Sequence, residues 1–119
     1  MTASVAFRLS AGLGFLAVAL GAFGAHALEP TLTEHDRVAT WETASLYHLV
    51  HAVVLCGIAS ATPFRQGAWW SFFIGILIFS GSLYTLCLTN VTKLGMVTPL
   101  GGLAFLIGWG CLIKAGRSS

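Results

Sequence analysis

Two histidines three residues apart, His48 and His51, are the side chains in this sequence best suited to chemistry. They form an H-x-x-H pattern in an otherwise apolar run, and positions three apart are neighbours on a helix. We therefore expect their imidazoles to reach one point. Arg37 falls on the same helical face above them, whereas Glu42 falls on another face. A third histidine, His26, ends the preceding apolar run.

Three interpretations of this polar site stay open. Imidazoles from His26, His48 and His51 would form a nitrogen ligand set suited to a transition metal or to haem iron. Histidines that titrate near neutral pH would equally serve as a proton relay in a small transporter or channel. In the third interpretation, which we favour, they hydrogen-bond across helices and fix the fold without any cofactor. The polar residues expected to join them are Tyr47, Ser80, Ser82, Tyr84 and Thr98.

The composition points to lipid as the surroundings of these residues. Hydrophobic residues make up 56% of the 119 and charged residues only 8%, where a soluble domain has about 25% charged residues. The outer surface must therefore face the lipid bilayer. A net charge of +2, spread along the chain without a basic run, excludes a nucleic-acid partner. We expect one domain over residues 1–119.

Four apolar stretches must position the polar site. Each is close to the roughly 20 residues that cross a bilayer, and they cover residues 9–28, 43–62, 68–90 and 94–113. Backbone within lipid must satisfy its own hydrogen bonds, so the stretches are predicted to be helices. Short connections make successive helices antiparallel neighbours. The expected fold class is all-α, a four-helix transmembrane bundle.

Proline and threonine suggest where these helices begin and end. Pro30 is expected to end the first helix. Thr33 and Asp36 have the spacing of a capping box, which predicts a second helix that starts near Glu34, beyond the membrane, and runs to about residue 61. Thr98 and Pro99 suggest a start for the fourth helix, with 93–97 as a loop. The alternative is one longer helix kinked at Pro99.

Small residues suggest which helix faces pack closely. Ala17, Gly21 and Ala25 are spaced by four, and Gly101 and Gly108 by seven. Small side chains let membrane helices approach one another. We expect both sets to lie at contacts inside the bundle.

Lysine and arginine set the expected orientation, because they are enriched in cytoplasmic flanks of membrane proteins. The residues predicted on one side are Arg8, Arg65, Lys114 and Arg117, and those on the other side are Arg37 and Lys93. The larger group is assigned to the cytoplasm. Both chain termini then lie there, and the protein is expected in the cell (inner) membrane.

No nucleophile motif, paired intramembrane carboxylates or phosphate loop is present in the sequence, so we do not expect an enzyme. A bundle this small exposes much helix surface, and a homo-oligomer is expected. The activity we favour is a structural or assembly role in the membrane. The alternatives are a metal- or haem-binding protein and a small transporter or proton-linked channel.

Four motifs together carry a resemblance to a known family. They are G-A-F-G-A-H at 21–26, E-T-A-x-x-Y-H-x-x-H at 42–51, F-S-G-S-L-Y at 79–84 and T-P-x-G-G at 98–102. This series resembles the YgdD/YwdK-like family of small multi-pass membrane proteins of unknown function. The resemblance implies a multi-pass inner-membrane protein and supplies no activity.

Overall fold

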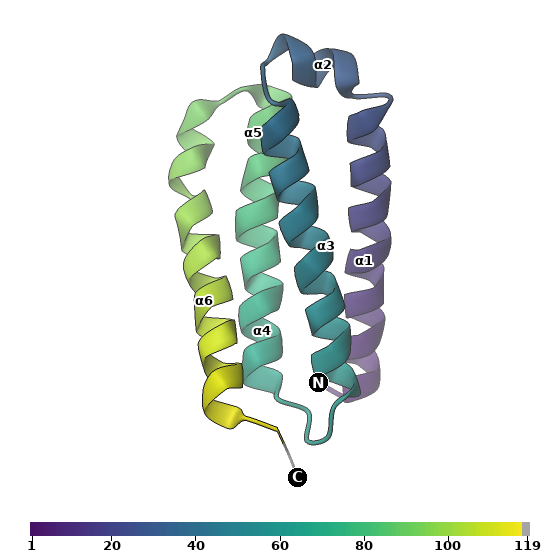
Figure 1. Ribbon diagram of the computed structural model, residues 1–119, viewed down its shortest axis with the longest axis vertical. Helices are drawn as coiled ribbons and strands as arrows, with labels where there is room; N and C mark the ends of the chain where they lie inside the picture. The colour runs from purple at the N-terminus through teal and green to yellow at the C-terminus, as the bar shows by residue number, and fades with distance from the viewer. Residues whose placement is uncertain (118–119) are drawn as a thin grey trace.

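The computed structural model describes residues 1–117 as an elongated bundle, 51 Å long and 25 × 21 Å across. Four long helical rods run up and down side by side, and one short helix lies across the end opposite to the chain termini (Figure 1). The described residues form helices and no strands, so the predicted all-α bundle with antiparallel neighbours is confirmed.

The first rod is α1, Ala3–Ala25, and Thr2 caps it by accepting a hydrogen bond from the Val5 amide at 3.1 Å. The helix ends at Ala25, where His26 takes a non-helical conformation. The prediction that Pro30 ends the first helix is therefore wrong. Pro30 lies in the first turn of a separate helix, α2, Glu29–Glu34, where a missing amide proton costs nothing.

The chain then turns sharply at Asp36, and this turn corrects the predicted capping box. Asp36 has φ 56°, in the left-handed region, and the amides of Asp36 and Arg37 donate to the carbonyls of Thr33 and Leu32. This is the Schellman arrangement that closes the end of a helix. The segment therefore ends α2 instead of starting the second rod. That rod is α3, Val38–Ser60, which begins four residues later than Glu34.

The third rod is continuous but has three parts. They are α4, Gln66–Gly75, a π-helical turn η1, Ile76–Ser80, and α5, Gly81–Thr89. A π turn holds one more residue than an α turn and rotates the side chains that follow it. The rod ends at Asn90, whose φ of 56° is left-handed.

The fourth rod is α6, Thr98–Ala115, preceded by a short 3₁₀ helix η2, Thr92–Met96. The predicted start of an α-helix next to Pro99 is therefore confirmed, although the 3₁₀ segment and α6 together form one apolar span, Thr92–Ala115. Val97 precedes the first helical residue, so Thr98 is not the N-cap, and the expected loop at 93–97 is mostly helical.

Helix α3 has the central position. It packs against α1 on one side and against the third rod on the other, and α6 packs on the far side of the third rod (Figure 1). The main apolar core includes Leu55, Trp69, Phe72 and Phe105. A smaller cluster of Leu32, Trp41 and Cys87 lies below α2. Cys56, Cys87 and Cys111 are free cysteines, and Cys87 is buried.

Four helices are long and apolar enough to cross a membrane. They cover Ala3–Ala25, Val38–Ser60, Gln66–Thr89 and Thr92–Ala115, close to the predicted 9–28, 43–62, 68–90 and 94–113. At most 39% of any of these spans is buried inside the bundle. Large apolar side chains point outward instead, with Phe15 79% and Ile113 83% exposed. Such a surface is typical of a protein in contact with lipid.

Candidate functional site

His51 uses both of its ring nitrogens inside the bundle. Nδ1 lies 2.8 Å from the Tyr47 carbonyl, one turn earlier on α3, and a carbonyl only accepts, so Nδ1 carries the proton. Nε2 is then free to accept the Trp109 indole N–H of α6 at 3.3 Å. The ring also stacks on Phe105, with centroids 3.8 Å apart and planes at 7°. His51 therefore joins α3 to α6.

His48 turns toward a different neighbour. Its Nδ1 lies 2.9 Å from the Tyr84 hydroxyl of α5, and the side chain is 2% exposed. Its Nε2 has no hydrogen-bond partner among the described residues. The ring faces a small groove of about 100 Å³ lined by α1 and the third rod.

The two imidazoles therefore do not reach one point, and this corrects the geometry expected from H-x-x-H. His51 extends toward Phe105 and Trp109, whereas His48 extends toward Tyr84. Within residues 1–117, no group of three His, Cys, Asp or Glu side chains is placed to hold a metal ion. The predicted three-histidine metal site is not assembled, because His48 and His51 pack against different helices and His26 is exposed at the end of α1.

Two other members of the predicted site lie away from these histidines. His26 is exposed at the end of α1, where its backbone amide closes the helix on the Phe23 carbonyl. Arg37 donates through Nε to Asn90 Oδ1 at 3.3 Å and so links the start of α3 to the end of α5. Eleven residues separate Arg37 from His48, which is about 16 Å along a helix. Arg37 therefore cannot act on His48 directly.

The hydroxyl residues predicted to hydrogen-bond within the membrane do so. Ser80, in the π turn, donates to the Ala44 carbonyl of α3 at 2.8 Å. The hydroxyls of Ser82 and Thr98 lie 2.6 Å apart and join α5 to α6. Tyr47 contributes an aromatic face instead, 4.8 Å from Phe79 between ring centroids. These contacts fit the interpretation that the polar residues fix the bundle.

Tryptophan and serine contacts complete this set, and the sequence analysis missed them. Trp41 donates its indole N–H to the Leu20 carbonyl of α1 at 2.9 Å. Trp69 donates to Ser10 Oγ at 2.9 Å, and Ser71 donates to the Ala104 carbonyl at 2.7 Å. An indole N–H within an apolar run needs an acceptor, and that signal was available in the sequence.

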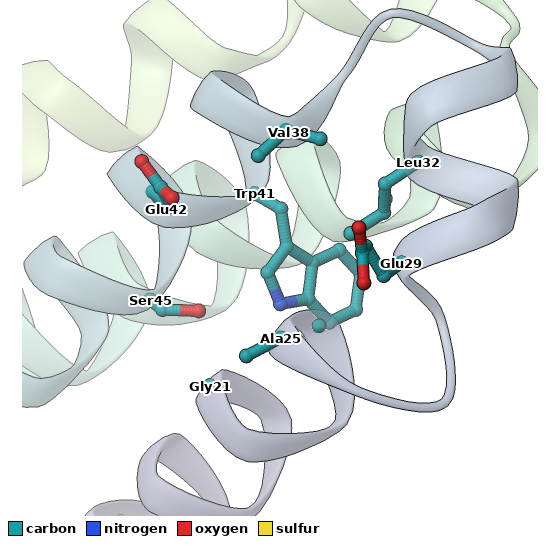
Figure 2. A pocket seen from close by; sticks show the side chains of 9 residues that line it. Gly21, Ala25, Glu29, Leu32, Val38, Trp41, Glu42 and Ser45 are labelled. Atoms are coloured by element: carbon teal, nitrogen blue, oxygen red, sulfur yellow. The ribbon is translucent and has the colours of Figure 1, made fainter.

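A pocket of about 510 Å³ opens beneath α2. Figure 2 shows Trp41 in its middle, with the Glu42 carboxylate on one side and the Glu29 carboxylate on the other. Glu42, predicted to face another neighbour than His48, belongs to this pocket. The remaining lining residues are Gly21, Gly24, Ala25, Leu32, Val38 and Ser45. Glu29 was not among the predicted site residues.

Comparison with known proteins supports the expected family. Residues 20–102 match the family described as "Protein of unknown function (DUF423)". The UPF0382 membrane protein YwdK of Bacillus subtilis is 43% identical over 106 residues, which cover 84% of this chain and 85% of that protein. UPF0382 membrane proteins of Staphylococcus aureus and Staphylococcus epidermidis are each 44% identical over 104 residues, 84% of either chain. No solved structure matches the chain.

Proposed function

The chain belongs to the DUF423 family of membrane proteins of unknown function, and on that premise we propose that it is a structural or assembly component of the membrane, without catalytic activity. It is a small multi-pass membrane protein, with four apolar helices. The observation that supports a structural role is the use made of its intramembrane polar groups. The buried polar side chains each form a hydrogen bond to another helix; they are Ser10, His48, His51 and Ser80.

Such connections join α3 to each of the other three rods. Trp41 joins α3 to α1, Ser80 joins the third rod to α3, and His51 joins α3 to α6. Hydrogen bonds between membrane helices contribute about 0.6 kcal/mol each, and up to about 1.7 kcal/mol. Several such bonds hold the helices in one arrangement, as a platform for neighbouring membrane components requires.

The alternative functions use the same histidines. Metal or haem binding has the weaker support, because His51 has no free ring nitrogen to ligate an ion. A proton-linked transporter would need a histidine that gains and loses a proton during transport. His48, with its unpartnered Nε2, is the residue that such a function would use.

A set of three variants separates these functions. His51→Phe keeps an aromatic ring against Phe105, whereas His51→Ala removes it. His48→Ala removes the imidazole whose Nε2 has no hydrogen-bond partner among the described residues. In a structural protein, His51→Ala lowers the free energy of unfolding by about 2–4 kcal/mol and His51→Phe by much less. Unfolding is measured in detergent by circular dichroism. Wild-type protein should purify without stoichiometric metal or a haem absorption band.

Transport is measured with the same proteins in sealed vesicles that contain a pH-sensitive dye. The structural role predicts equal proton leak for wild type and His48→Ala. A proton flux in wild type that is lost in His48→Ala would contradict the structural role and establish transport. Metal that copurifies with wild type and is lost in His51→Phe would establish the binding function instead.

We also propose the cell (inner) membrane as the location, with both termini in the cytoplasm. The two termini lie at the same end of the bundle (Figure 1), as four spans require. Arg65, in the loop at that end, contacts the Gly116 carbonyl at 3.5 Å. The cytoplasmic assignment rests on the larger number of basic residues at this end.

A homo-oligomer is the final part of the proposal. The outer face of α6 carries Leu103, Leu106 and Ile107, which are 54%, 69% and 53% exposed. A second copy packed there would bury apolar surface that otherwise contacts lipid. Light scattering of the protein in detergent gives the mass of the assembly, and a mass of one chain would contradict this part.

A further inference from the structure

The pocket beneath α2 combines a charged rim with an apolar floor. Glu29 and Glu42 are exposed, whereas Trp41 and Leu32 are 3% and 1% exposed and close the floor (Figure 2). Its volume of about 510 Å³ lies in the range of pockets that bind small molecules, about 300–1,000 Å³. A ligand that fits has both a polar group and a hydrocarbon part.

The position of the pocket along the bundle places it at the boundary between headgroups and hydrocarbon. Helix α1 has 23 residues, about 35 Å at 1.5 Å per residue, against a hydrocarbon core of about 30 Å. Gly21 lies four residues before the end of α1, and Glu42 lies four residues after the start of α3. Both are about 6 Å inside the helix ends. A membrane amphiphile therefore reaches the pocket with its head at the height of the carboxylates.

The charge of the pocket determines which headgroup an amphiphile bound there can carry. Its lining holds two carboxylates and no Lys, Arg or His. The nearby Arg37 side chain is turned toward Asn90 on α5. Two uncompensated carboxylates on opposite sides of a pocket attract a cation and repel an anionic lipid head. A bare metal ion is not favoured, because within residues 1–117 no third ligand joins such a pair.

We propose that this pocket binds a membrane amphiphile with a cationic amine head. The ammonium group lies between the carboxylates of Glu29 and Glu42, and the hydrocarbon chain follows the apolar floor formed by Trp41 and the small residues of α1. This binding site is additional to the structural role and does not depend on it.

Gly21 offers a way to block the pocket without disturbing the fold. A Cβ placed on Gly21 meets no atom within 4 Å, whereas one on Gly24 would lie 2.1 Å from Trp41 Nε1. A larger side chain at Gly21 therefore extends into the open pocket. The Gly21→Leu variant is expected to fold and to exclude the ligand.

Binding is measured by native mass spectrometry of the purified full chain in non-ionic detergent, titrated with hexadecylammonium. Hexadecanol, which has the same chain and a neutral head, is the comparison ligand. We expect one saturable hexadecylammonium per chain and weaker binding of hexadecanol. The double variant Glu29→Gln/Glu42→Gln should weaken hexadecylammonium binding about tenfold or more. Gly21→Leu should abolish it.

Glu34→Gln is the matched control, because Glu34 is an exposed carboxylate on α2 that does not line the pocket. It should bind hexadecylammonium as wild type does. Three results would overturn the proposal: equal binding of hexadecanol, equal weakening by Glu34→Gln, or binding unaffected by the double variant. The glutamates are exposed, so the double variant tests the site even where Gly21→Leu fails to fold.

Discussion

His48 and Tyr84 form a polar contact inside the bundle that joins α3 to α5. His48 is 2% exposed, and one of its two ring nitrogens already lacks a partner. The other ring nitrogen, Nδ1, lies 2.9 Å from the Tyr84 hydroxyl and forms a hydrogen bond with it. A neutral imidazole has one donor and one acceptor. Removing the hydroxyl would therefore leave the whole ring without a hydrogen bond in an apolar environment.

Tyr84→Phe is predicted to lower the free energy of unfolding by about 1 kcal/mol, because a buried imidazole loses its partner. The substitution keeps the ring that packs 4.7 Å from Trp41 between centroids, so packing changes little. Chemical unfolding in detergent, followed by circular dichroism, measures the effect.

Ser60→Ala is the control for a hydroxyl that does not connect helices. Ser60 is exposed and donates to the Cys56 carbonyl of its own helix. Its removal should change the free energy of unfolding by less than about 0.5 kcal/mol. An effect of Tyr84→Phe no larger than that of Ser60→Ala would contradict the assigned role of the His48 contact.

The sequence predicted that these residues form hydrogen bonds across helices, but it did not predict in which direction each side chain extends. Ser80, Ser82, Tyr84 and Thr98 were expected to hydrogen-bond across helices, because polar groups in lipid need partners. The spacing of His48 and His51 places both on one helical face but leaves the side-chain rotamers open. Those rotamers depend on Tyr84 and Trp109, which lie on helices far along the chain.

At the scale of helices, glycine sets how closely α6 approaches the third rod. A Cβ on Gly101 would lie 2.3 Å from the Phe79 backbone nitrogen, and one on Gly108 would lie 2.8 Å from the Phe72 ring. In the reverse direction, a Cβ on Gly75 of the third rod would lie 2.5 Å from the Phe105 ring of α6. Alternating glycine and phenylalanine across this interface lets each ring occupy the space above a glycine. Backbone contact as close as that at Gly101 leaves no room for a methyl group.

Gly101→Ala is therefore predicted to destabilise the bundle by about 1–3 kcal/mol, because α6 must move away from the third rod. Gly110→Ala is the matched control on the same helix, since a Cβ there meets nothing within 4 Å. It should be neutral or stabilising, because alanine favours a helix more than glycine does. Unfolding of both variants in detergent measures the difference, and equal stabilities would contradict the close approach.

The sequence predicted four helices well but some of their local geometry poorly. Gly101 and Gly108 lie at a helix contact as expected, whereas Gly21 faces an open pocket and Gly24 makes the close contact with Trp41. A repeat of small residues predicts a packing face only approximately. Residues three positions apart lie on the same side of a helix, so the close contact can form at Gly24 instead of Gly21. The π turn at Ile76–Ser80 has no mark in the apolar pattern. It depends on contacts with α3, such as the Ser80 bond to Ala44.

At the scale of the whole molecule, basic side chains divide between the two ends of the bundle. Arg65 lies in the loop at the end that holds both termini, and Arg37 lies beside α2 at the other end (Figure 1). The sequence places four basic residues at the first end and two at the second. Lysine and arginine near short loops are retained in the cytoplasm during insertion. The difference of two charges is small enough to be removed by two substitutions.

The double variant Arg65→Gln/Lys114→Gln leaves Arg8 and Arg117 at the end that holds the termini. The two ends then carry two basic residues each. We predict that this variant inserts in both orientations, whereas wild type inserts with its termini in the cytoplasm. Alkaline phosphatase fused to the C-terminus, which is active only outside the cytoplasm, measures the inverted fraction. It should be inactive on wild type and active on part of the variant population.

Arg65→Lys/Lys114→Arg keeps every charge and should leave the phosphatase inactive. Within residues 1–117, the hydrogen bond of the Arg65 side chain is an exposed 3.5 Å contact to Gly116, so neutralising Arg65 should change orientation without unfolding the bundle. Active phosphatase on wild type would place the termini outside and the pocket beneath α2 in the cytoplasmic leaflet. The orientation thus decides which leaflet supplies the amine amphiphile, because Glu29 and Glu42 lie at the end opposite the termini.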